Sequence, residues 1–81
     1  MSVELTAIQR TALNALADAC DFSINAHPPE EFVLKRVKSH LRGDVRKALC
    51  QLRRMGLAQK HPTRGSTTWN ITGDGLRSAQ H

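Results

Sequence analysis

The chain has 81 residues, of which 40% are hydrophobic and 23% charged, and its net charge is +5. This length suffices for one domain with a single core but not for two. No apolar run approaches the ~20 residues of a membrane span, and two cysteines, Cys20 and Cys50, are too few for a disulfide framework. We therefore expect a single domain over residues 1–81 in a reduced, cytoplasmic setting, associated with the nucleoid if the chain is prokaryotic.

The charges are unevenly distributed along the chain. Residues 1–31 hold one basic and five acidic residues, a net charge of −4, whereas residues 32–81 hold eleven basic and two acidic ones, a net charge of +9. A surface that serves only solubility mixes the two signs more evenly. A basic block confined to one part of a small domain is the expected footprint of a phosphate-binding surface.

The first predicted helix covers about residues 6–20. Thr6 followed by Gln9 matches a capping box, in which each side chain accepts a hydrogen bond from the backbone N–H of the other residue. His27-Pro28-Pro29 cannot continue a helix, because proline lacks the backbone N–H and restricts the residue before it. The apolar residues recur at three- and four-residue spacing, at Leu5, Ile8, Ala12, Leu16 and Ala19.

A second helix is predicted over about residues 29–39. Pro29 suits its first turn, where the missing N–H has no partner in any case. Glu30 and Glu31 then complement the positive end of the helix dipole. Val33, Leu34 and Val37 form its expected apolar side, and Ser39-His40-Leu41 is expected to be a short turn.

A third helix is predicted over about residues 42–55. Ser39 is its candidate N-cap, and Gly56 is the expected C-terminal stop, since glycine readily adopts the left-handed conformation there. At 100° per residue one stripe of this helix is apolar and the opposite one is mostly basic. The apolar stripe, which we expect to be buried, consists of Val45, Ala48, Leu49, Leu52 and Met55.

A β-hairpin is predicted over about residues 57–72. Residues 62–66 (Pro-Thr-Arg-Gly-Ser) have the composition of a turn. In the β-forming run after them Trp69 and Ile71 share one face at period two, which indicates that Trp69 belongs to the core. A last helical turn can follow Gly75. The predicted fold is thus mainly α with a small β-hairpin, in the α+β class.

Three helices followed by a hairpin correspond to the plan of a winged helix-turn-helix domain. Val45, Leu49 and Leu52, followed by Met55-Gly56-Leu57, resemble a pattern of many winged-helix transcription regulators, including those similar to the multiple-antibiotic-resistance regulators. Residues 65–72 (Gly-Ser-Thr-Thr-Trp-Asn-Ile-Thr), with Gly75 three residues on, resemble their wing. The resemblance covers most of residues 6–75 and implies a domain that binds double-stranded DNA.

In a helix-turn-helix domain the second helix of the motif enters the major groove. Arg46 is the candidate for reading guanine, because its guanidinium can bond both major-groove acceptors of that base. Gly43 leaves room for a close approach, and the other cations suit phosphates or remain solvated surface charges. The candidate residues of this helix are Arg42, Gly43, Arg46, Lys47, Cys50, Gln51, Arg53 and Arg54. Those of the wing, expected at the minor groove or the flanking phosphates, are Lys60, His61, Arg64, Gly65 and Ser66.

Two other readings of these residues deserve comparison. Domains that bind left-handed Z-form nucleic acid are similar winged helices with a tryptophan where Trp69 stands, but they carry an asparagine and a tyrosine where this chain has Arg46 and Cys50. Cys50 lies among basic residues, so it is either a redox-sensing cysteine or an ordinary exposed thiol. The four histidines are scattered and form no metal-binding motif, and no catalytic constellation is legible.

We therefore expect a DNA-binding transcription regulator and not an enzyme, with no cofactor, no metal, no membrane and no small-molecule substrate. A homodimer is one expected assembly, because symmetric regulators commonly pair through terminal elements. The alternative is a winged helix that serves as a protein-protein interaction module within a larger assembly.

Overall fold

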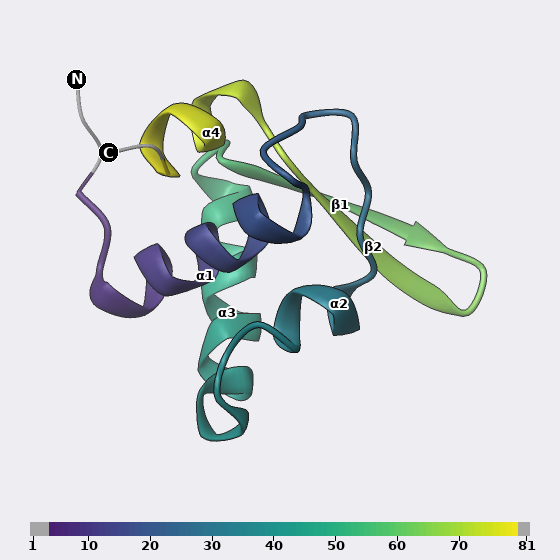
Figure 1. The fold of residues 1–81 in the computed structure, drawn as a ribbon, viewed down its shortest axis with the longest axis horizontal. Coiled ribbons are helices and arrows are strands. Elements are labelled where there is room, and N and C mark those ends of the chain that lie inside the picture. Colours follow the sequence, from purple (N-terminus) through teal and green to yellow (C-terminus); the bar gives the residue numbers. More distant parts are fainter. Residues whose placement is uncertain (1–3, 80–81) are drawn as a thin grey trace.

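The computed structural model describes residues 4–79 and has a mixed α+β architecture (Figure 1). Helices α1 and α3 pack against each other, and a two-stranded antiparallel sheet projects from one side of the helices. In chain order the elements are α1 (Ala7–Ala19), α2 (Glu30–Leu34), the 3-10 turn η1 (Ser39–Leu41), α3 (Arg42–Arg54), β1 (Ala58–Thr63), β2 (Ser66–Ile71) and α4 (Gly73–Ala79).

The predicted capping box at the start of α1 is confirmed. The backbone N–H of Gln9 donates to Thr6 Oγ1 at 3.2 Å, and the N–H of Thr6 donates to Gln9 Oε1 at 3.0 Å. The apolar face of the helix is buried, with Leu13 and Leu16 completely inaccessible to solvent. The local sequence thus fixes where α1 begins, and burial of its apolar face fixes which side it turns to the core.

Helix α2 is shorter than predicted, because the helix expected over residues 29–39 ends at Leu34. The chain leaves α2 through tight turns and reaches an extended backbone at Lys38. The carbonyl of Leu34 accepts two hydrogen bonds at this helix end, from the N–H of Val37 and from Nε of Arg42, each at 3.2 Å. The early stop lets the chain turn back so that α3 can pack against α1.

The predicted caps of the second and third helices are also corrected. Pro29 lies just before α2 rather than in its first turn, in an extended conformation and in a β-bridge with Thr68. Ser39 does not cap α3, since the residue before that helix is Leu41 and no side chain caps it. Ser39 begins η1 instead, which lies where the sequence predicts a short turn.

Helix α3 buries the predicted stripe except at its end. Val45, Leu49 and Leu52 are completely buried, as expected, whereas Met55 is 37% exposed, so its predicted burial was wrong. Met55 follows the last helical residue, and Gly56, with φ +80°, reverses the chain immediately after it. Leu57, only 3% exposed, enters the core directly after this reversal.

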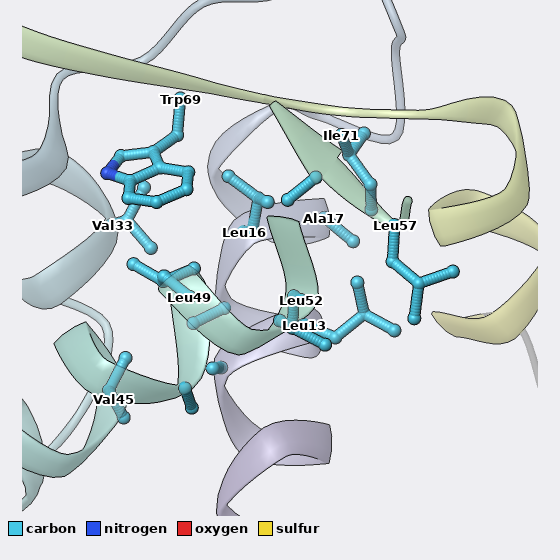
Figure 2. Close-up of a cluster of buried hydrophobic side chains, with 14 of the residues drawn as sticks. Leu13, Leu16, Ala17, Val33, Val45, Leu49, Leu52, Leu57, Trp69 and Ile71 are labelled. Carbon is cyan, nitrogen blue, oxygen red and sulfur yellow. The ribbon is translucent and has the colours of Figure 1, made fainter. Parts of the chain in front are cut away.

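The hairpin contributes two large side chains to the core. Its strands pair from Ala58 opposite Ile71 to Thr63 opposite Ser66, close to the predicted bounds. Trp69 and Ile71 are completely buried, which confirms the predicted core position of Trp69. Figure 2 shows both side chains pointing from the hairpin toward the cluster that contains Leu49. Burial of side chains of this size is worth roughly 1.5–3 kcal/mol each.

A fourth helix closes the structure where only a last turn was expected. Helix α4 packs against α1, and its Gly75 is buried against the end of β2. A Cβ at Gly75 would overlap the carbonyl of Leu57 and lie 2.7 Å from Cγ1 of Ile71. Glycine at this position is therefore a requirement of close packing.

Candidate nucleic-acid interface

The outward face of α3 carries the candidate recognition residues. The side opposite Val45 and Leu49 is exposed along the whole helix, because residues three or four apart share a face. One exposed row consists of Arg42, Arg46, Cys50 and Arg53, and the row beside it consists of Gly43, Lys47 and Arg54. The structure thus brings seven of the eight predicted residues of this helix onto one continuous surface.

Gln51 is the exception. Its Oε1 accepts a hydrogen bond from Gln9 Nε2 at 2.7 Å, so the side chain reaches toward α1 rather than toward the basic rows. Gln9 is itself held by the capping box with Thr6. Gln51 therefore connects α3 to the beginning of α1 and is not part of the basic face of α3.

Two arginines of α3 already have partners. Arg42 Nε donates to the backbone of Leu34, as described above. Arg46 Nε lies 3.7 Å from Oε2 of Glu30, the first residue of α2. The Arg46 side chain is still 61% exposed, whereas that of Glu30 is 22% exposed. The guanidinium thus remains accessible from outside while a largely covered carboxylate holds its inner edge.

Three other cations on the same face have no partner among residues 4–79. Lys47, Arg53 and Arg54 are exposed, and within residues 4–79 none of the three forms an ion pair or a side-chain hydrogen bond. Apart from its two chain neighbours and the backbone of its own helix, no described atom lies within 4 Å of a Cβ built on Gly43. This part of the face therefore combines unneutralised positive charge with open space, and only Asp44 adds a negative charge to the first turn of α3.

The hairpin presents its cations at two distances from the helices. Arg64 and Gly65 form the exposed two-residue tip, with Gly65 at φ +81°. Lys60 lies further back, with Nζ 5.8 Å from the ring centre of Trp69 on the strand opposite. Ser66 begins β2 directly after the tip. Arg64 is thus the cation that extends furthest from the core along the hairpin.

His61 also lies back from the tip and is held in place. Its Nε2 is 2.6 Å from Oδ1 of the buried Asn70, and its ring meets that of His27 edge-on with the centres 5.1 Å apart. The contact with Asn70 crosses the hairpin, and His27 comes from the segment before α2. His61 therefore connects the hairpin to that segment, a role that its place in the sequence did not indicate.

Sequence reasoning missed one residue of this surface. Glu30 was interpreted only as a complement to the helix dipole, yet it is the carboxylate that contacts Arg46. The two residues are 16 positions apart and lie on different helices, so no spacing rule connects them. Only the packing of α2 between α3 and the hairpin brings them together.

The two cysteines differ in their surroundings. Cys20 is buried, and this burial raises the pKa of its thiol. Cys50 is exposed on the basic face of α3. Among the described residues no three His, Cys, Asp or Glu side chains gather in a way that would hold a metal ion, and no helix there is long and apolar enough to cross a membrane.

Comparison of the chain with protein-family models, with curated proteins and with solved structures gave no match. Function must therefore be inferred from the charge, exposure and contacts of the residues described here.

Proposed function

We propose that this protein is a winged helix-turn-helix DNA-binding protein that regulates transcription. Helix α3 lies in the major groove of double-stranded DNA, and the β1–β2 hairpin is the wing that contacts the flanking backbone or minor groove. The order of three helices followed by an antiparallel hairpin supports this proposal. So does the pairing of a short α2 with a longer α3 across a tight connection, since a helix-turn-helix has this arrangement.

The observation that carries the proposal is the outward face of α3. Lys47, Arg53 and Arg54 are exposed and unpaired there in the described structure, on a helix whose opposite side is completely buried. A helix of about 10–12 Å diameter fits the major groove, which is ~12 Å wide. Unpaired cations along such a helix neutralise phosphates on both sides of the groove.

Arg46 is the base-reading residue of the proposed complex, and Lys47, Arg53, Arg54 and Arg64 are its phosphate contacts. Arg42 stabilises the turn through its Nε, and Lys60 and His61 hold the base of the wing. Gly43 gives the DNA backbone room near the start of α3. No catalytic step and no cofactor is part of this proposal.

The test is duplex binding measured over a salt series. Four phosphate contacts predict a log-log slope of about −3.6, which corresponds to a loss of affinity of roughly a hundredfold between 50 and 200 mM salt. Selection of bound sequences from a random duplex pool then gives the target site. A palindromic site would indicate that the protein binds as a homodimer, since operator symmetry mirrors protein symmetry.

A protein-protein interaction module is the second candidate function. The observation that favours it is a loop between α1 and α2 that exposes two large apolar side chains, Phe22 and Ile24, each to 51%. Phe22 has φ +55° and Asp21 before it has φ +52°, so this loop keeps a strained backbone. Absence of duplex binding at 50 mM salt would favour this function over the first.

A further inference from the structure

We propose that Glu30 is a positioning residue that sets the sequence specificity of the interface by holding Arg46 ready for base readout. This inference rests on the DNA-binding function proposed above. Oε2 of Glu30 lies 3.7 Å from Nε of Arg46, and this is the ion pair that links α2 to α3.

The backbone directly before Glu30 is held to strand β2 of the hairpin. Pro29, directly before it, forms a β-bridge with Thr68, and the carbonyl of Pro28 accepts a hydrogen bond from the N–H of Trp69 at 2.9 Å. Trp69 is completely buried, so this part of the hairpin cannot shift without disturbing the core. The backbone at the start of α2 therefore has a fixed place beside the hairpin, and the carboxylate of Glu30 reaches Arg46 from there.

The edge of the Arg46 guanidinium that Glu30 contacts determines which of its N–H groups can still bond DNA. The carboxylate faces Nε, and the two terminal amines of the guanidinium have no partner among residues 4–79. Guanine presents two acceptors, O6 and N7, in the major groove, and the two terminal amines can bond both at once. An arginine whose Nε edge forms an ion pair in this way has fewer conformations to lose when it bonds the base.

The negative charge has a second consequence. Glu30 lies within a surface that otherwise attracts phosphates, and it opposes any binding in which Arg46 merely contacts the backbone. Random duplex DNA offers mainly such backbone contacts. Glu30 therefore weakens non-specific binding more than specific binding, where the Nε edge stays paired with the carboxylate. Both effects raise the ratio of specific to non-specific affinity.

The experiment compares dissociation constants for the selected duplex and for a scrambled duplex of the same length, at one salt concentration. Glu30→Gln is expected to lower the ratio of the two affinities about tenfold. Glu31→Gln is the matched control, because it removes the same charge from the next residue of α2, where the side chain is exposed and has no ion pair among residues 4–79. We expect Glu31→Gln to keep the ratio within twofold of wild type.

Two further variants separate positioning from charge and from stability. Glu30→Asp keeps the charge but withdraws the carboxylate by one methylene, so its ratio should lie between those of wild type and Glu30→Gln. Arg46→Lys removes the group that is positioned, so adding Glu30→Gln to it should lower the ratio no further. The thermal midpoint of each variant shows whether it is folded. If Glu30→Gln does not fold, the affinity ratio of Glu30→Asp decides whether Glu30 positions Arg46.

The outcomes distinguish this inference from the function on which it rests. If wild type selects a site but Glu30→Gln and Glu31→Gln have equal ratios, or if the losses from Glu30→Gln and Arg46→Lys multiply, Glu30 does not position Arg46 and only this inference fails. If wild type selects no sequence from the random pool, base readout itself is absent. The proposed function and the inference then fail together.

Discussion

Replacement of Leu49 by alanine tests the packing of α3 on the core. Leu49 is completely buried on the inner side of the helix whose outer side carries the proposed interface. The substitution removes three carbon atoms from a site with no access to solvent. At ~0.8 kcal/mol per buried methylene the transfer cost alone is about 2.4 kcal/mol.

The cavity left by Leu49→Ala adds to this cost. Leucine-to-alanine changes in protein cores cost about 2–5 kcal/mol in total, because the surroundings relax only in part. For a domain of this size each kcal/mol lowers the thermal midpoint by roughly 4–8 °C. The Leu49→Ala protein is thus expected to melt at least about 8 °C below wild type.

Urea unfolding followed by circular dichroism measures the difference, with the slope of the free energy against urea expected to stay unchanged. Met55→Ala is the control, since Met55 belongs to the same stripe of the helical pattern but is 37% exposed. Met55→Ala should lower the free energy of unfolding by much less than Leu49→Ala does. Equal losses for the two variants would refute the placement of the helix end at Gly56, and a loss below about 1 kcal/mol for Leu49→Ala would refute its burial.

Four other predictions follow from the packing, the charges and the cysteines. Gly75→Ala should destabilise by about 1–3 kcal/mol in urea unfolding, because the added methyl overlaps backbone. Arg64→Ala should reduce the salt slope of duplex binding by about one unit, equally on all sequences. Cys50 should react with iodoacetamide in the native protein and Cys20 only on unfolding. Because burial raises the pKa of the folded Cys20 thiol, its contribution to stability is present below pH 9.0 and is lost as pH rises above it.

Local signals in the sequence predicted most element boundaries. The capping box of Thr6 and Gln9, the stop at Gly56 and the alternation around Trp69 each depend on a few neighbouring residues, and each is confirmed. Such features are decided within one turn of helix or one strand pair. A single sequence therefore contains the information that they require.

The end of α2 and the exposure of Met55 depend on contacts between residues that are distant in the sequence. The apolar pattern continues to Val37, but α2 stops at Leu34, whose carbonyl accepts hydrogen bonds from the N–H of Val37 and from Arg42 of the next helix. Met55 fits the buried stripe by phase, yet it is 37% exposed, and it is Leu57 that is buried after the chain reverses at Gly56. Tertiary packing overrode a periodicity that was locally sound in both cases.

The candidate site shows the same division. The helical phase of α3 predicted the exposure of Arg46 and Lys47. It did not predict that Gln51 would bond Gln9 on α1 or that Glu30 would contact Arg46, because both contacts join residues on different elements. The sequence thus indicated which side chains of α3 point away from the core. The structure added which of them contact residues of other elements.

The most direct test of base readout by α3 is the affinity of Arg46→Lys for the selected duplex and for a scrambled one. Lysine keeps the positive charge but loses the two-pronged donor geometry. The proposed interface predicts a loss of about 1–3 kcal/mol on the selected duplex and almost none on the scrambled one. Equal weakening of both would contradict it, and Arg46 would then be a phosphate contact.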